Sequence, residues 1–283
     1  VDDFGKPESR NFPVGIASAG SGSNCPSETL AEAFQTRNGY DVILTNNGFE
    51  SKDPSFDPKK PFANRDPRFA MVFAVNGEKK WPISNGDGLE TFYGGVSGEP
   101  KVGGTPTGYY LKKLLDGNLD LSPTGRKKTS RHSWMTFRLG EIYLDYAEAA
   151  FRATGSYTAV PAGCELSALQ AVNMIRQRPG VNMPALPSTL SNDEFWEKYK
   201  NERFVEICFE DQRFFDVRRW KEGDEYFKKV KELKITKNDD GSFTYRPDYQ
   251  DREWDNKMYL FPIPEEDILK SKGNMIQNPG WGK

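Results

Sequence analysis

The densest group of acidic and basic side chains in the sequence lies in residues 201–220, NERFVEICFEDQRFFDVRRW. Nine of these twenty residues are charged, and carboxylates are interspersed with guanidinium groups. Two carboxylates that face a common solvent-filled space can act as general acid and general base, as in glycoside hydrolysis. The alternative is a structural helix, in which enclosed charges must pair with one another.

Helical periodicity favours the structural alternative. At about 100° per residue, Arg203, Glu206, Glu210 and Arg213 fall within one narrow arc, where residues three and four apart are neighbours. The apolar residues of this stretch point in nearly every direction, and a helix that is apolar on all sides is buried on all sides. We therefore predict a buried helix over about residues 192–220, with these four residues as a structural ion network and with no catalytic residue.

The residues needed for several other chemistries are missing or scattered. His132 is the only histidine, and the cysteines Cys25, Cys164 and Cys208 lie far apart, so neither a multi-histidine metal site nor a zinc site is expected. The stretch NGDGLE, 85–90, lacks the ligand spacing of an EF-hand calcium loop. Phosphate-binding and dinucleotide-binding motifs are absent from the sequence, so we expect no cofactor. The formal net charge of −2 gives no indication of a nucleic-acid partner.

Two more helices are predicted before residue 192. Residues 138–154 place charged side chains on one face and apolar side chains on another, and a second helix over about 165–178 ends at Pro179-Gly180. This helix hairpin has the length and pattern of a tetratricopeptide-like unit, and one such unit cannot bury its own faces. We therefore expect residues 1–283 to associate with another polypeptide. The contact is expected to involve Leu139, Ile142, Tyr143 or Tyr146 of the first helix, or the second helix near Leu169 and Val172.

The remainder of the chain is expected to be rich in loops. A short helix should begin after Ser27, a favourable N-cap residue, and the alternation in residues 68–77 predicts a strand that ends in an Asn76-Gly77 turn. Residues 81–108 contain eight glycines in 28 positions and predict a long, shaped loop of the kind that often carries function. The fold class is therefore mainly α, with at least one tetratricopeptide-like helix pair, a large irregular region and short β-hairpins.

Six segments of the chain, taken together, resemble the SusD/RagB family of nutrient-binding outer-membrane lipoproteins. Residues 201–220 match the family pattern E-R-x-x-E-x-x-F-E-x-x-R-x-x-D-x-R-R-W. The other segments are NRDPRF (64–69), TGYYLKKLLD (107–116), FRLGEIYLDYAEAAFRATG (137–155), AVNMIRQRPGV (171–181) and YLFPIPEEDI (259–268). Their order along the chain makes the resemblance specific.

The resemblance implies an α-α superhelix and three regions in this chain: a loop-rich, ligand-facing region in 1–136, a helical region in 137–222, and a C-terminal region in 223–283 that packs on the helices. Family members begin with a lipoprotein signal and several tetratricopeptide-like helix pairs. These residues would therefore correspond to the C-terminal half, with the N-terminal half and its lipid anchor absent from this chain.

The resemblance also implies a non-catalytic function. Such proteins sit at the cell surface on the outer membrane, bind an oligosaccharide and deliver it to a SusC-like TonB-dependent transporter during polysaccharide utilisation. The expected partners are this transporter, the ligand and the missing N-terminal half. A peptide-binding member of the same family and, less favoured, a glycoside hydrolase are the alternatives.

A glycan site needs exposed aromatic rings, which cover the C–H faces of sugars, and nearby amides or carboxylates, which bind hydroxyl groups. The glycine-rich loop offers both kinds of residue. The candidate ligand-binding residues are Trp81, Asn85, Asp87, Phe92 and Tyr93. The alternative for the three rings is that they pack the loop onto the helices.

Overall fold

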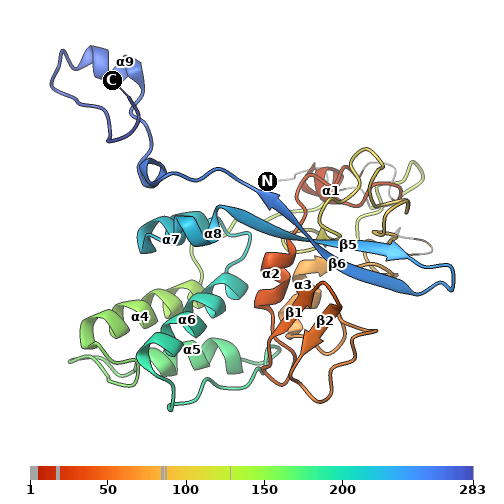
Figure 1. Ribbon diagram of the computed structural model, residues 1–283, viewed down its shortest axis with the longest axis horizontal. Coiled ribbons are helices and arrows are strands. Elements are labelled where there is room, and N and C mark those ends of the chain that lie inside the picture. Colours follow the sequence, from red (N-terminus) through yellow and green to blue (C-terminus); the bar gives the residue numbers. More distant parts are fainter. Residues whose placement is uncertain (1–5, 17–19, 84–85, 87, 128, 283) are drawn as a thin grey trace. The chain divides into compact units, whose positions relative to one another are not determined.

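The computed structural model describes residues 6–16, 20–83, 86, 88–127 and 129–282. Its helices are α1 (Lys6–Asn11), α2 (Glu28–Ala33), α3 (Pro67–Val72), α4 (Leu139–Thr154), α5 (Ala168–Gln177), α6 (Asn192–Glu206), α7 (Gln212–Trp220), α8 (Gly223–Tyr226), the 3₁₀ helix η1 (Asn256–Tyr259) and α9 (Glu265–Lys270). Its strands are β1 (Val42–Thr45), β2 (Gly48–Ser51), β3 (Phe73–Ala74), β4 (Tyr110–Leu111), β5 (Lys229–Lys237) and β6 (Phe243–Asp251). They pair as β1–β2, β3–β4 and β5–β6 (Figure 1).

The chain forms two compact units. The first consists of Val1–Phe209 and Lys231–Asp248, and the second of Glu210–Val230 and Tyr249–Lys283. In the second unit, the Arg218 guanidinium lies over the rings of Phe214 and Phe261, at 4.8 and 4.2 Å from the ring centroids. None of the described helices is both long enough and apolar enough to span a membrane.

Helices α4, α5 and α6 lie side by side in the first unit (Figure 1). The α4–α5 pair is the predicted helix hairpin: Leu144, Ala147 and Ala150 of α4 are buried, and α5 begins with a capping box at Ser167. Helix α4 ends at Gly155, whose φ of 66° is the left-handed conformation that glycine adopts without strain. The predicted fold class, mainly α with a helix pair and short hairpins, is confirmed.

A second layer of the first unit is built around aromatic residues of α2, α3 and the short strands. Phe69 and Phe73 stack at 4.5 Å between ring centroids, and Phe34 and Tyr109 contact Phe73 edge-on at 5.3 and 5.2 Å. Ser27 caps α2 as predicted, because its hydroxyl accepts the backbone N–H of Leu30. This aromatic core holds the loop-rich region together where regular structure is scarce.

The strand predicted for residues 68–77 is wrong over most of its length. Residues 67–72 form helix α3, and only Phe73 and Ala74 belong to a strand. The cause lies just before the alternating run: the Asp66 carboxylate accepts the backbone N–H of Arg68, and Pro67 occupies the first helical turn. These two start signals specify a helix.

The single helix predicted over about 192–220 is also wrong, because α6 ends at Glu206 and α7 begins at Gln212. Phe209 and Asp211 have φ values of 60° and 64°, which an α-helix cannot contain. Side chains bind carbonyl groups at the end of α6: Arg138 Nη2 donates to Glu206 O at 2.6 Å, and Lys113 Nζ donates to Cys208 O at 2.7 Å. The break has no glycine or proline, so the sequence gives no ordinary stop signal.

The residues expected to contact another polypeptide differ in exposure. Leu139 and Ile142 are 67% and 50% exposed on α4, whereas Val172 of α5 is fully buried within the unit, so the expectation for Val172 is wrong.

Association of the chain with another polypeptide stays a prediction. We expect light scattering to show self-association of residues 1–283, which should decrease when Leu139 and Ile142 are both replaced by lysine, because exposed apolar surface drives association. A monodisperse wild-type monomer would contradict it.

Candidate functional site

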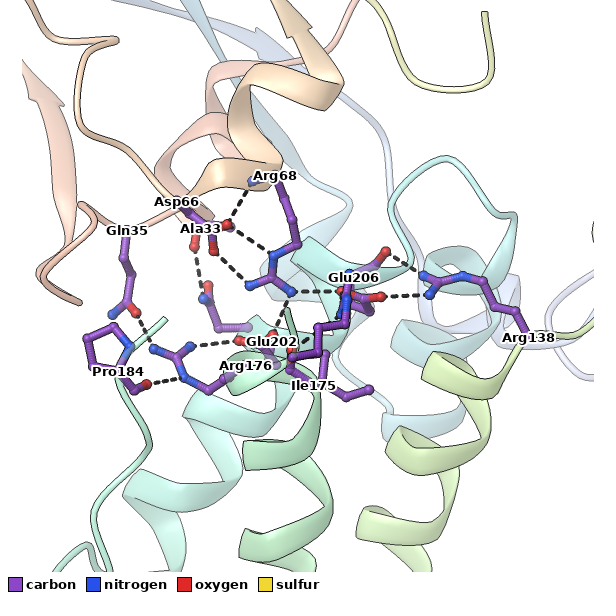
Figure 2. Close-up of polar contacts among 12 residues, drawn as sticks. Ala33, Gln35, Asp66, Arg68, Arg138, Ile175, Arg176, Pro184, Glu202 and Glu206 are labelled. Carbon is purple, nitrogen blue, oxygen red and sulfur yellow. Dashed lines mark hydrogen bonds and ion pairs between the residues drawn. The ribbon is translucent and has the colours of Figure 1, made fainter. Parts of the chain in front are cut away.

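The acidic residues at the end of α6 lie in a buried ion network, formed by Asp66, Arg68, Arg138, Arg176, Arg178, Glu202 and Glu206 (Figure 2). Arg68 of α3 is its centre. Its guanidinium lies 2.7 Å from Asp66, 2.6 Å from Glu202 and 2.8 Å from Glu206, and all four of these side chains are at most 6% exposed.

Glu206 binds three arginines from three parts of the chain. Arg138 reaches its Oε1 at 2.6 Å, while Arg68 and Arg178 each reach Oε2 at 2.8 Å. Figure 2 shows Arg68 and Arg138 approaching Glu206 from opposite sides. Burial alone would raise the pKa of the Glu206 carboxyl, but the hydrogen bonds and charges of Arg178, Arg68 and Arg138 outweigh it and lower the pKa to about 2.

Glu202 is held in the same way, one helical turn earlier. Its Oε1 accepts Arg68 and its Oε2 accepts Arg176 at 2.7 Å. Arg176 in turn donates to the side chain of Gln35 at 3.1 Å and to the carbonyl of Pro184 at 2.8 Å. All four carboxylate oxygens of Glu202 and Glu206 are therefore occupied by guanidinium groups, which leaves no oxygen to exchange a proton with a substrate.

Of the four residues predicted as an ion network, only Glu206 lies in this one. Arg203 donates to Asp145 of α4 at 2.6 Å. Glu210 and Arg213 follow the end of α6 and belong to the second unit, where the Arg213 guanidinium lies 4.2 Å from the centroid of the Tyr226 ring. The arginine partners of Glu206 are thus contributed by distant segments of the chain.

An open cavity of about 600 Å³ lies elsewhere in the first unit, in the loop-rich region. Four parts of the chain contribute to it: the segment after α1, the turn after β3, the glycine-rich loop and the distal part of the β5–β6 hairpin. The lining residues are Gly15, Ile16, Asn76, Gly77, Gly86, Gly88, Leu89, Glu90, Phe92, Val96, Lys237, Phe243 and Tyr245. Its volume lies within the ~300–1,000 Å³ typical of small-molecule sites.

Aromatic rings form one wall of the cavity. Phe92 and Phe243 contact each other with ring centroids 5.7 Å apart and planes tilted by 38°. Tyr245 lies two residues further along β6, so its side chain shares the face of Phe243. Burial raises the pKa of the Tyr245 phenol, and its protonated hydroxyl can donate a hydrogen bond.

Polar groups surround this wall. The Glu90 carboxylate accepts the backbone N–H of Val96 at 3.2 Å, and the Asn76 side chain accepts the N–H of Thr91 at 3.0 Å. Gly15, Gly77 and Gly86 of the lining are exposed, so parts of their backbone are accessible to a ligand. Such a mixture of ring faces and short polar groups can bind a ligand that is apolar on its faces and hydroxylated at its edges.

The predicted ligand-binding residues fall into three groups. Phe92 lines the cavity, whereas Tyr93 is 68% exposed and is not among the lining residues. Trp81 packs edge-on against Phe12 at 5.3 Å, and a methyl group at Gly117 would lie 2.1 Å from its ring. Trp81 thus packs within the loop-rich region on these sides, and its contact with a ligand stays a prediction. Asn85 and Asp87 lie outside the described residues.

Phe243 and Tyr245 line the cavity, although neither is among the predicted ligand-binding residues. Their spacing within SFTYR, 242–246, is a signal that could have identified them, because two aromatic residues at i and i+2 share one face of a strand. Among the described residues, no group of three or more histidine, cysteine, aspartate or glutamate side chains is arranged to hold a metal ion.

The structure combines a layer of helices with an irregular region whose loops enclose an open, partly aromatic cavity. These features define a helical protein whose candidate site is built mainly from loops. The sequence model of the SusD family matches residues 3–281, and the chain therefore belongs to the SusD family. The resemblance of its six segments to this family is thereby confirmed.

Solved structures share the fold of this chain, and a curated protein resembles it in sequence. A SusD-like protein from Bacteroides fragilis is 26% identical, with a TM-score of 0.76 over 99% of this chain and 52% of its own. A SusD-like carbohydrate-binding protein from the same species is 18% identical, with a TM-score of 0.67 over 92% of this chain and 50% of its own. SusD-like protein P2 of Formosa agariphila is 26% identical over 178 residues, which are 61% of this chain and 29% of that protein. The chain thus spans about half the length of the solved relatives.

Proposed function

We propose that this protein is a cell-surface nutrient-binding protein that captures an oligosaccharide and delivers it to a SusC-like TonB-dependent transporter of the outer membrane. Membership of the SusD family supports a nutrient-binding role. One of the structural relatives is described as a carbohydrate-binding protein. We extend the proposal to the location: an outer-membrane lipoprotein that faces the outside of the cell.

The observation that carries the proposal is the Phe92–Phe243 wall of the open cavity. Sugar rings expose C–H groups on their faces, and aromatic rings are the side chains that cover such faces with little loss of conformational entropy. The neighbouring Asn76 and Glu90 side chains and the exposed glycine backbone supply acceptors and donors for hydroxyl groups. Tyr93 and Trp81 remain proposed contacts for parts of a longer ligand that extend beyond the cavity.

The carboxylates argue for binding without hydrolysis. Glycosidases place two carboxyl groups on opposite sides of the scissile bond. Among the described lining residues of the cavity, Glu90 is the only acidic one. The larger group of carboxylates, at Glu202 and Glu206, is saturated by arginines inside the fold.

Replacement of Phe243 by leucine should weaken oligosaccharide binding about threefold to tenfold, because leucine keeps the apolar volume but loses the flat aromatic face. Calorimetric titration with a panel of oligosaccharides would measure this change. Tyr40→Ala is the matched control, since Tyr40 is an exposed aromatic residue of the first unit that does not line the cavity.

Three outcomes would contradict the proposal. Equal binding by wild type and Phe243→Leu, with equal melting temperatures, would place the ligand elsewhere. Binding of a mixture of short peptides, but of no oligosaccharide in the panel, would replace the glycan by a peptide. Steady release of sugar product, abolished by Glu90→Gln, would show hydrolysis.

A further inference from the structure

Three lysines surround the cavity. Lys237 belongs to its lining, and its Nζ lies 5.2 Å from the centroid of the Phe92 ring. Lys101 and Lys79 stand beside two lining glycines: a methyl group at Gly15 would lie 2.9 Å from Lys101 Nζ, and one at Gly88 would lie 3.3 Å from Lys79 Cγ. The three lysines thus lie in or beside the lining and belong to the hairpin, the glycine-rich loop and the turn after β3.

The acidic residues nearby do not neutralise these lysines. Glu78 pairs with Lys112 at 2.8 Å, and Glu99 pairs with Lys234 at 2.8 Å. Glu90 remains, and one of its oxygens accepts the backbone N–H of Val96.

Across the described residues, no ion pair joins any of the three cavity lysines to a carboxylate. All three side chains are exposed and therefore accessible to a ligand. The described surroundings of the cavity accordingly carry more positive than negative charge.

From this imbalance we infer that the cavity prefers acidic glycans, whose sugar rings carry carboxylate or sulfate groups, over neutral ones. The inference rests on the proposed glycan-binding function and adds the charge of the substrate to it. In such a complex the Phe92–Phe243 wall covers a ring face, and the lysine amines pair with the anionic substituent at the ring edge. Lysine suits this role because its ammonium group can donate hydrogen bonds in several directions. It does not need the fixed, forked geometry in which a guanidinium group binds an anion.

The physical signature of this preference is its dependence on salt. Exposed charges interact over a screening length of about 8–10 Å at moderate ionic strength and about 3 Å at 1 M. Binding of an acidic glycan should therefore weaken as sodium chloride is added. Contacts with ring faces and hydroxyl groups should change little under the same conditions.

The test compares each acidic ligand with its own neutral form. One arm uses oligosaccharides rich in uronic acid before and after carboxyl reduction, and the other uses sulfated oligosaccharides before and after desulfation. We expect at least one acidic form to bind about tenfold or more tightly than its neutral form at low salt, with a smaller difference at high salt. The two arms then tell carboxylate from sulfate recognition.

Variants test whether these three lysines cause the preference for the acidic form. The triple variant Lys79→Gln, Lys101→Gln and Lys237→Gln should reduce the preference for the acidic form to about twofold or less, while binding of the neutral form is unchanged. Lys60→Gln, an exposed lysine outside the cavity lining, should leave the preference intact.

The outcomes distinguish the inference from the function on which it rests. If the tightest ligand of the panel is neutral, or if removal of the charge strengthens binding, the inference is overturned and the glycan-binding function stands. If no oligosaccharide binds in either form, the proposed function fails and the inference fails with it. If the triple variant keeps the full preference, the lysines are not its cause and the inference is overturned.

Discussion

Glu206→Ala should lower the free energy of unfolding by about 3–5 kcal/mol, because the substitution leaves arginines in a buried site without their counter-charge. Arg68 is the most affected: it is only 6% exposed and would keep Asp66 and Glu202 as partners but lose one of three ion pairs. Arg138 and Arg178 would lose the Glu206 carboxylate as well. Chemical denaturation monitored by circular dichroism would measure the loss.

Lys198→Ala is the matched control on the same helix. Its amine pairs with Asp41 at 3.6 Å, and both side chains are at least 40% exposed. Exposed pairs contribute little, so the control should change the stability by less than about 1 kcal/mol. If both substitutions lower the free energy of unfolding by a similarly small amount, the Glu206 carboxylate is exposed to solvent in the folded protein. A large effect of Glu206→Ala alone supports the buried network.

Glu28→Gln should change how stability depends on pH. The Glu28 side chain of α2 is fully buried, and its Oε2 accepts the Tyr109 hydroxyl at 2.5 Å. Burial raises the pKa of this carboxyl to about 8, although the Tyr109 hydrogen bond and the charges of Arg65 and Lys231 oppose the shift, while the neighbouring Glu32 adds to it. The folded protein therefore keeps the proton at neutral pH, whereas the unfolded chain releases it.

The direction of the pH effect follows from where the proton is bound. Below about pH 4.5, the ordinary pKa of the carboxyl, both states are protonated and Glu28 contributes no pH dependence. Between that value and about pH 8, only the folded state holds the proton, so stability falls as pH rises, by at most about 4–5 kcal/mol in total. Glutamine cannot ionise and should abolish this fall.

Denaturation curves of wild type and Glu28→Gln between pH 5 and pH 8 would test this expectation. The difference in stability should grow in favour of the variant as the pH rises. Glu206 does not interfere, because its pKa is lowered to about 2 and the stability it contributes is lost only as the pH falls below about 4.5. Parallel curves for the two proteins over this range would show that the Glu28 carboxyl is not protonated in the fold.

The sequence predicts a helix well where it has both a helical pattern of apolar residues and a residue that marks the end of the helix. Residues 138–154 have a two-faced pattern and stop at Gly155, and the observed helix, Leu139–Thr154, agrees almost to the residue. The break after Glu206 was not predictable in this way, because Phe209 takes a left-handed conformation that its residue type does not favour. Contacts from Lys113 and Arg138 to carbonyl groups near the break help to hold this conformation, and both residues are distant in sequence.

The candidate site, too, could be predicted only in part from the sequence. Phe92 was identified because it stands in a loop whose glycines exclude regular structure, and the loop does line the cavity. Phe243 and Tyr245 come from a hairpin about 150 residues later in the chain, and nothing local indicates that the two segments meet. Trp81 looked equally suitable in sequence, but its environment in the fold is the edge of Phe12 and the backbone of Gly117.

The Glu206 network also bears on the time course of folding. Arg68 lies 134 and 138 residues away from Glu202 and Glu206, and Arg176 lies 141 residues away from Gln35. Closing such long loops costs entropy before any contact is made, so we expect these pairs to form late, after the local helix hairpin of α4 and α5. Interactions that form after the rate-limiting step act mainly on the unfolding rate. We therefore expect substitutions in the network to speed unfolding more than they slow folding.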